Sequence, residues 1–136
     1  MHFTIQTTNH WNAGFFASWV RLRNACNAGE EGFLSESLGD LARIFSPNAL
    51  FDQENEWLAI AVNDPKSGEC LARATVSFPK ARGSLAFAPV GWFDARENPE
   101  AASAVLNTAA QWAAAHDFKR VRGPMDGNFF YSYLIY

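Results

Sequence analysis

One stretch of the chain limits the fold more than any other. Ser84–Pro124 is typical of a strand, a crossover helix and a second strand. Ser84–Ala95 is rich in aromatic and small apolar residues, and Lys119–Arg122 predicts a short strand closed by Gly-Pro. Between them Asn98 can cap a helix, and Pro99 suits its first position, where a missing N–H costs nothing. Such a unit is nearly always right-handed with parallel strands.

The predicted crossover helix has a face of mostly small apolar residues, so it can lie close against a sheet. Trp112 is the one large member of that face, and we expect it to anchor the helix. Because ligands of such units bind at the carboxyl ends of the strands, beside a helix N-terminus, the sequence points to a site around Asp94–Ala102. The residues that recur at helical spacing are Ala101, Ala102, Val105, Leu106, Ala109, Trp112 and Ala113.

Pro89 interrupts the first strand of this unit. Proline cannot donate to a strand ladder, so we expect a bulge at Pro89, and Gly91 allows another group to approach the backbone closely. Two interpretations stay open. The bulge either only bends the strand, or it leaves backbone amides free near residues 91–93 to bind a carbonyl or an oxyanion.

The sequence upstream predicts two helices and three strands. Helical spacing of apolar residues indicates helices at about 11–26 and from Leu34 to Phe45. Phe3–Thr7 alternates like a half-buried strand, whereas Glu56–Val62 is an apolar run typical of a strand buried on both faces. Cys70–Phe78 alternates and forms a hairpin with that run. These elements predict an α/β (α+β) fold with a mixed sheet flanked by helices.

Composition narrows the class of protein. The 136 residues are 49% hydrophobic and carry a formal charge of −3, which predicts one folded domain spanning residues 1–136 and no basic surface for nucleic acid. No apolar run approaches the ~20 residues of a membrane span, and no signal-peptide pattern opens the chain, so we expect a cytoplasmic protein. Cys26 and Cys70 are interpreted as free thiols, with a disulfide as the alternative. The three histidines lack metal-ligand spacing, which argues against a metal site.

Three segments together resemble the GNAT superfamily of acyl-CoA N-acyltransferases, in particular an uncharacterised bacterial branch. They are Gly91–Asp94 with the sequence Gly-Trp-Phe-Asp, Ala109–Ala113 in the helix, and Arg122–Asn128 with its Gly-Pro-Met turn. The resemblance implies a mixed, mostly antiparallel sheet flanked by helices, with one parallel strand-helix-strand unit at 84–124. It also implies transfer of an acyl group from acetyl-CoA or another acyl-CoA to a small-molecule or peptide amine.

The resemblance further implies which residues contact coenzyme A. In the family, the bulged fourth strand contacts the pantetheine arm, and the following helix holds the pyrophosphate. The strand contact falls on Trp92, Phe93 and Asp94. The family's pyrophosphate loop has Arg or Gln, two residues, Gly, one residue, then Gly or Ala, and here it has Pro99 in place of the central glycine. The implied pyrophosphate residues are Arg96 and the amides of Ala101 and Ala102.

Two catalytic candidates follow from the resemblance. In the family a base, often Glu, deprotonates the amine, and a Tyr past the fifth strand protonates the leaving thiolate. Glu97 is the carboxylate nearest the predicted site, with a solvated loop glutamate as the alternative. Tyr131 follows the polar Asn128, with packing in a core or an interface as the alternative. A non-catalytic module of the same fold that binds a ligand or partner is the alternative function, because the phosphate loop departs from the pattern.

The chain ends on an apolar and aromatic segment, residues 129–136, without a charge. Such a segment would be sticky if exposed. Two expectations follow: the fold is incomplete at its C-terminus, or the segment is buried against a partner, as in a homodimer.

Overall fold

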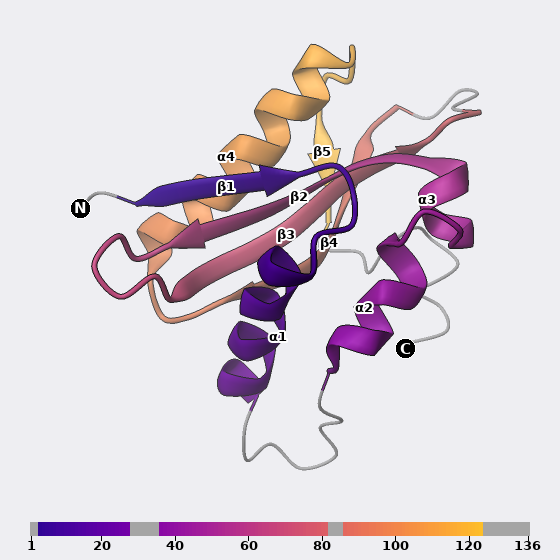
Figure 1. The fold of residues 1–136 in the computed structure, drawn as a ribbon. Coiled ribbons are helices and arrows are strands. Elements are labelled where there is room, and N and C mark those ends of the chain that lie inside the picture. Colours follow the sequence, from indigo (N-terminus) through magenta and orange to yellow (C-terminus); the bar gives the residue numbers. More distant parts are fainter. Residues whose placement is uncertain (1–2, 28–35, 82–85, 124–136) are drawn as a thin grey trace.

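The computed structural model describes residues 3–27, 36–81 and 86–123, which form a sheet between two layers of helices (Figure 1). The strand order is β1-β2-β3-β4-β5; the first three pairings are antiparallel and β4 with β5 is parallel. The predicted mixed, mostly antiparallel sheet with one parallel unit is therefore confirmed. The elements are β1 (Thr4–Thr8), α1 (Ala13–Asn27), α2 (Leu38–Phe45), α3 (Leu50–Glu54), β2 (Asn55–Asn63), β3 (Cys70–Pro79), β4 (Ala88–Ala95), α4 (Pro99–Ala115) and β5 (Val121–Arg122).

Each face of the sheet buries its own core. Helix α4 covers one face with small side chains, and aliphatic residues of β2, β3 and β4 pack beneath it. On the other face, α1, α2 and α3 enclose a cluster of aromatic rings. Alternation along β2 supplies both cores, because Ile60 and Val62 point to α4 while Ala59 and Ala61 point to the aromatic side.

The starts of α2 and α4 follow sequence signals. Ser37 caps α2: its hydroxyl accepts from the amide of Asp40, and the carboxylate of Asp40 accepts from the amide of Ser37. The hydrogen bond from the Ser37 backbone to the Asp40 carboxylate, with a smaller contribution from the Ser37 side chain, holds the pKa of Asp40 below its usual value. At α4, the predicted cap is confirmed, since Asn98 Oδ1 accepts from the amide of Ala101 at 3.1 Å and Pro99 opens the helix.

Several local predictions need correction. Helix α3 was not predicted; it forms because Phe51 is buried against the aromatic rings of Phe45 and Trp92. Strand β1 is not half-buried: it is mostly exposed, with Ile5 48% exposed, because it forms the edge of the sheet. Cys70 is buried, but it lies in the aromatic cluster instead of beside the other alternating residues of β3.

The tryptophans differ in how deeply they are buried. Trp112, expected to anchor α4, is only partly buried at the margin of its core, beside Phe78 and His116. The fully buried face of α4 is Ala101, Val105, Ala109 and Ala113. Trp19 of α1 is completely buried instead, and its indole N–H donates to the carbonyl of Ile60 at 3.1 Å. The stronger anchor is therefore on α1.

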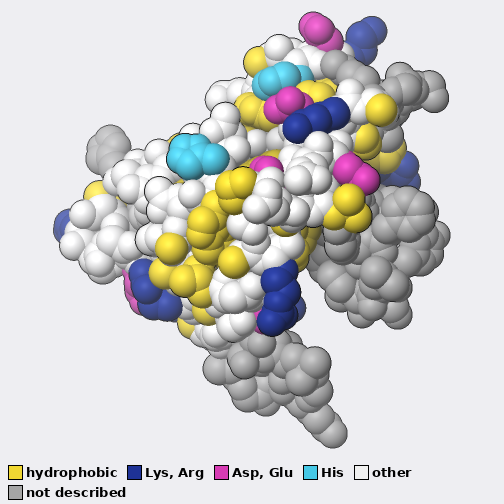
Figure 2. Space-filling view, turned by 45° about the vertical axis from the view of Figure 1, so that its right-hand side comes forward, with side chains coloured by type: hydrophobic (Ala, Val, Ile, Leu, Met, Phe, Trp, Pro, Cys, Tyr) yellow, Lys and Arg dark blue, Asp and Glu magenta, His cyan; other side chains and the backbone are white. Residues whose placement is uncertain are grey.

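Charged side chains are scattered over the face of the molecule shown in Figure 2. On the face shown in Figure 2, Lys and Arg side chains lie apart from one another, with Asp and Glu side chains near several of them, around a band of hydrophobic side chains.

Among the described residues no helix is long and apolar enough to cross a membrane.

We expect Trp19→Ala to lower the free energy of unfolding by ~3–5 kcal/mol, because it removes a fully buried ring from the aromatic core. Trp112→Ala is the matched control and should cost clearly less, since Trp112 keeps part of its surface in water. Urea unfolding of both variants measures the difference. Equal losses would contradict this assignment of the anchor.

Candidate functional site

A bulge in β4 is the central feature of the candidate site. Gly91 pairs with Thr75 and Asp94 with Arg73, so two residues of β4, Trp92 and Phe93, face the single residue between Arg73 and Thr75 on β3. Trp92 has a φ of 48°, in the left-handed region that a non-glycine residue rarely adopts. A bulge in this strand was predicted, but the predicted position, Pro89, is wrong.

Pro89 is therefore not the cause of the bulge. The pairing of β4 with β3 begins one residue later, at Val90, so proline sits at the end of that ladder, where its missing N–H is tolerated. On its other side Pro89 pairs with Arg122 of β5, and within the described residues the parallel pairing covers only Ala88 and Pro89. The bulge lies beyond this paired part.

The bulge reverses the direction in which the side chains of β4 point. Before it, Ala88 and Val90 pack under α4. After it, Phe93 packs on that same core, whereas Trp92 is buried among the rings of the opposite face. Asp94 follows Phe93 along the strand and points to the same face as Trp92. One added residue thus moves Trp92 and Asp94 from the α4 side to the α1 side.

Asp94 is one of four charged side chains that form a cluster. Arg73 of β3 is fully buried, and its guanidinium lies 2.6 Å from Glu36 Oε1, 3.2 Å from Glu36 Oε2 and 3.1 Å from Asp94 Oδ2. Arg23 of α1 lies 3.2 Å from the same Asp94 oxygen. No role was predicted for Arg73, Arg23 or Glu36 from the sequence. The available signal was a single arginine in the alternating run Cys70–Phe78, an unusual residue to bury unless it is paired.

The start of α4 follows directly after β4 and carries the other predicted residues. Both amides predicted to hold a pyrophosphate are already used by the cap: the amide of Ala101 donates to Asn98 Oδ1, and that of Ala102 donates to Asn98 O at 3.1 Å. Arg96 is held more loosely, 3.3 Å from Glu69 Oε1 and partly exposed. Glu97 is exposed. Arg96 therefore suits an anionic group, whereas the two amides suit one only if the cap opens.

The predicted residues thus fall into two adjoining parts of the molecule. Trp92, Phe93 and Asp94 form the bulge and the strand after it. Tyr131 lies outside the described residues. The other four predicted residues, Arg96, Glu97, Ala101 and Ala102, form the turn into α4 and its first turn.

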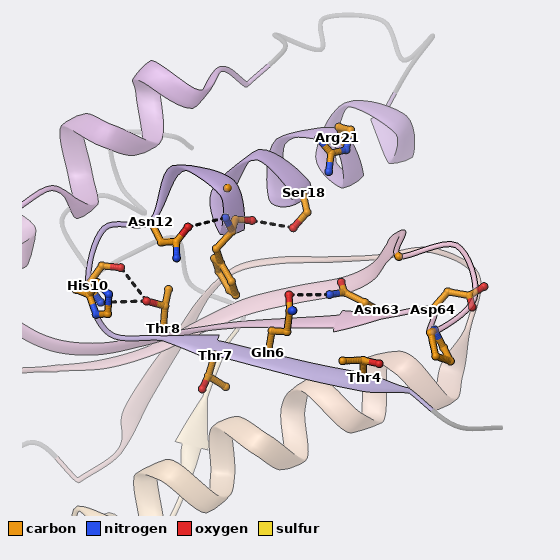
Figure 3. Close-up of a pocket in the computed structure, with 14 residues that line it drawn as sticks. Thr4, Gln6, Thr7, Thr8, His10, Asn12, Ser18, Arg21, Asn63 and Asp64 are labelled. Atoms are coloured by element: carbon orange, nitrogen blue, oxygen red, sulfur yellow. Dashed lines mark hydrogen bonds between the residues drawn. The ribbon is translucent and has the colours of Figure 1, made fainter.

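Neither of two hollows on the described part of the surface is lined by the residues of the bulge. One, of about 380 Å³, is lined by Pro99, Glu100, Ser103, Ala104 and Asn107 on the outer side of α4. The other, of about 730 Å³, lies between β1 and α1 (Figure 3). It is polar: the amide of Asn63 donates to Gln6 Oε1 at 3.0 Å within it, and Ser18 and Arg21 line it from α1. It is at the other end of the sheet from β4 and β5.

Metal chemistry has no cluster to support it in the described part of the chain. There, no group of three or more His, Cys, Asp or Glu side chains is placed to hold a metal ion.

We expect Asn98→Ala to destabilise the protein by about 1 kcal/mol, because it leaves the amide of Ala101 without its acceptor. Asn107→Ala, on the exposed side of the same helix, is the matched control and should be neutral or slightly stabilising. Chemical unfolding measures both. A neutral Asn98→Ala would show that the cap contributes nothing.

Comparison with known proteins shows which solved structures share this fold. No protein-family model and no curated protein sequence matches the chain. Among solved structures, an aminoglycoside acetyltransferase from an uncultured soil metagenomic sample, in complex with trehalose, matches with a TM-score of 0.62 and 12% identity over 98% of this chain and 84% of that one.

Two further acetyltransferases match over almost the whole chain. The aminoglycoside enzyme AAC(6')-Iy, in complex with a bisubstrate analogue of CoA and acetylneamine, gives a TM-score of 0.57 and 13% identity over 99% of this chain and 87% of that one. The ribosomal-protein-alanine N-acetyltransferase of Brucella melitensis gives 0.61 and 11% over 99% and 89%. The protein therefore has the fold of the GNAT acyltransferases.

Proposed function

We propose that the protein transfers an acyl group from acyl-CoA to an amine. The observation that carries the proposal is the bulge at Trp92–Phe93, which follows the short parallel pairing of β4 with β5 and precedes the capped start of α4. Within the described residues, the strand register gives neither Trp92 nor Phe93 an opposite residue on β3 or β5. Their amides are the proposed donors to the acyl carbonyl.

Each residue has a proposed role in the reaction, for which acyl-CoA supplies the activated thioester. The amides at Trp92 and Phe93 stabilise negative charge on the carbonyl oxygen while the substrate nitrogen attacks. Glu97 accepts the proton that the amine loses as the new C–N bond forms. Tyr131 gives a proton to the thiolate released when the C–S bond breaks. Arg96 pairs with the pyrophosphate, an interaction suited to a guanidinium.

The acyl acceptor is proposed as a small-molecule or peptide amine. Structures of the same fold include enzymes named for aminoglycosides and for a ribosomal-protein alanine, so both kinds of amine are served by this fold. Fold alone does not choose between them, since one fold hosts many substrates.

A second function is favoured by the start of α4. Pro99 removes one amide, Asn98 occupies two more, and Glu100 adds negative charge to the first turn, where a phosphate would be repelled. These features suit a non-catalytic module that binds another ligand or a partner. Calorimetric titration of acetyl-CoA into the protein separates the two: saturable heat supports the transferase, and its absence at millimolar ligand, together with an unchanged melting temperature, supports the module.

If acetyl-CoA binds, Arg96→Ala should weaken its affinity by about 1–3 kcal/mol, because it removes a charged hydrogen bond to the pyrophosphate. Arg21→Ala, which removes an exposed arginine of α1 at the far side of the sheet, is the control and should leave the affinity unchanged. The same titration measures both variants. An Arg96→Ala protein with parental affinity would remove this residue from the site.

A further inference from the structure

We propose that Arg73 is a positioning residue: acting through Asp94, it holds the bulge at Trp92–Phe93 in the conformation that presents the amides. The structural half of this proposal concerns the backbone of β4 alone. Its functional half, that the bulge must be held for acyl-CoA to bind, rests on the function proposed above.

The first argument is the direction of the side chains along β4. Regular alternation from Ala88 and Val90 would continue with Trp92 and Asp94 on the α4 side. That side is a packed layer of small and aliphatic residues, where a buried carboxylate without a cation is strongly unfavourable. The extra residue of the bulge brings Asp94 to the other side, within 3.1 Å of Arg73. Pairing of these two charges therefore requires the bulge.

The second argument is the strain in the backbone. Trp92 has a left-handed φ of 48°, and such a conformation persists in a non-glycine residue only when its surroundings impose it. Two sets of contacts can do so. The ring of Trp92 packs 5.1 Å from that of Phe45 and 5.7 Å from that of Phe51, which holds the first residue of the bulge. The Arg73–Asp94 pair holds the residue that follows the bulge.

The third argument is the environment of Arg73 itself. Its guanidinium is fixed from several directions, by Glu36, by the carbonyl of Trp19 at 3.1 Å and by the Trp19 ring 5.0 Å away. Its buried Nε has no hydrogen-bond partner among the described residues. Charged clusters buried in this way are often no more stabilising than apolar residues of similar volume. A role in orienting Asp94 accounts for the cluster better than a gain in stability does.

The experiment compares variants of the pair with a variant that only destabilises. Arg73→Met removes the charge while keeping much of the volume, and Asp94→Asn removes the opposite charge with almost no change in shape. Ile60→Ala, in the core at β2, is the control for lost stability, because β2 is not paired with β4 in the sheet. Two properties are measured in each protein: the backbone chemical shifts and amide exchange of Trp92 and Phe93 by NMR, and the affinity for acetyl-CoA.

We expect Arg73→Met and Asp94→Asn to move the Trp92 backbone shifts away from left-handed values and to speed its amide exchange by about tenfold or more. Affinity for acetyl-CoA should fall by about tenfold, the loss expected for one hydrogen bond to the carbonyl. The double variant should lose no more affinity than either single one, because both act through the same bulge. Ile60→Ala should have the parental Trp92 shifts and the parental affinity, although its melting temperature is lowered to a similar extent.

A folded Arg73→Met protein with parental Trp92 shifts would overturn the proposal. If that variant does not fold, Asp94→Asn decides by the same measurement. Changed shifts with parental acetyl-CoA affinity would overturn the functional half. A parental protein that does not bind acetyl-CoA would refute the proposed transferase and this functional half together, while the NMR comparison would still decide whether Arg73 holds the bulge.

Discussion

Arg73 carries a fully buried charge that must be paired, and this requirement constrains the structure around it. A guanidinium without access to water needs carboxylates within hydrogen-bond distance, and here they come from two distant segments, Glu36 before α2 and Asp94 in β4. Arg23 of α1 adds a second cation beside both. Because the cluster joins α1, the start of α2, β3 and β4, it ties the helices of one face to the middle of the sheet.

The consequence for β4 is that one strand serves both cores. Its first half contributes Val90 to the layer under α4, and after the bulge it contributes Trp92 to the aromatic layer and Asp94 to the charge cluster. The strain at Trp92, of the order of 1–2 kcal/mol for a left-handed residue, is offset by burial of a large ring and by the ion pair. The bulge is thus a product of side chains on the far side of the sheet from α4.

The same region contains features that favour different functions. The bulge and the short parallel pairing of β4 with β5 suit the binding of an acyl carbonyl, and the fold is shared with acetyltransferases. At the start of α4, in contrast, Asn98 satisfies the amides that an anion would use. A helix whose N-terminal amides are already paired has less to offer a phosphate. Binding of coenzyme A would thus depend more on Arg96 and the strand than on the helix.

The sequence by itself determined the order of most elements, the parallel strand-helix-strand unit and the cap of α4, because alternation, helical spacing and capping residues act over a few neighbouring positions. It also predicted a bulge in β4, but at Pro89. Only the tertiary structure decided that the bulge lies at Trp92–Phe93, that β1 is an exposed edge and that the segment around Phe51 is helical. These outcomes depend on partners distant in sequence: whether Asp94 faces α4 or α1 is settled by Arg73 and Arg23, 21 and 71 positions away, and no local pattern contains that information.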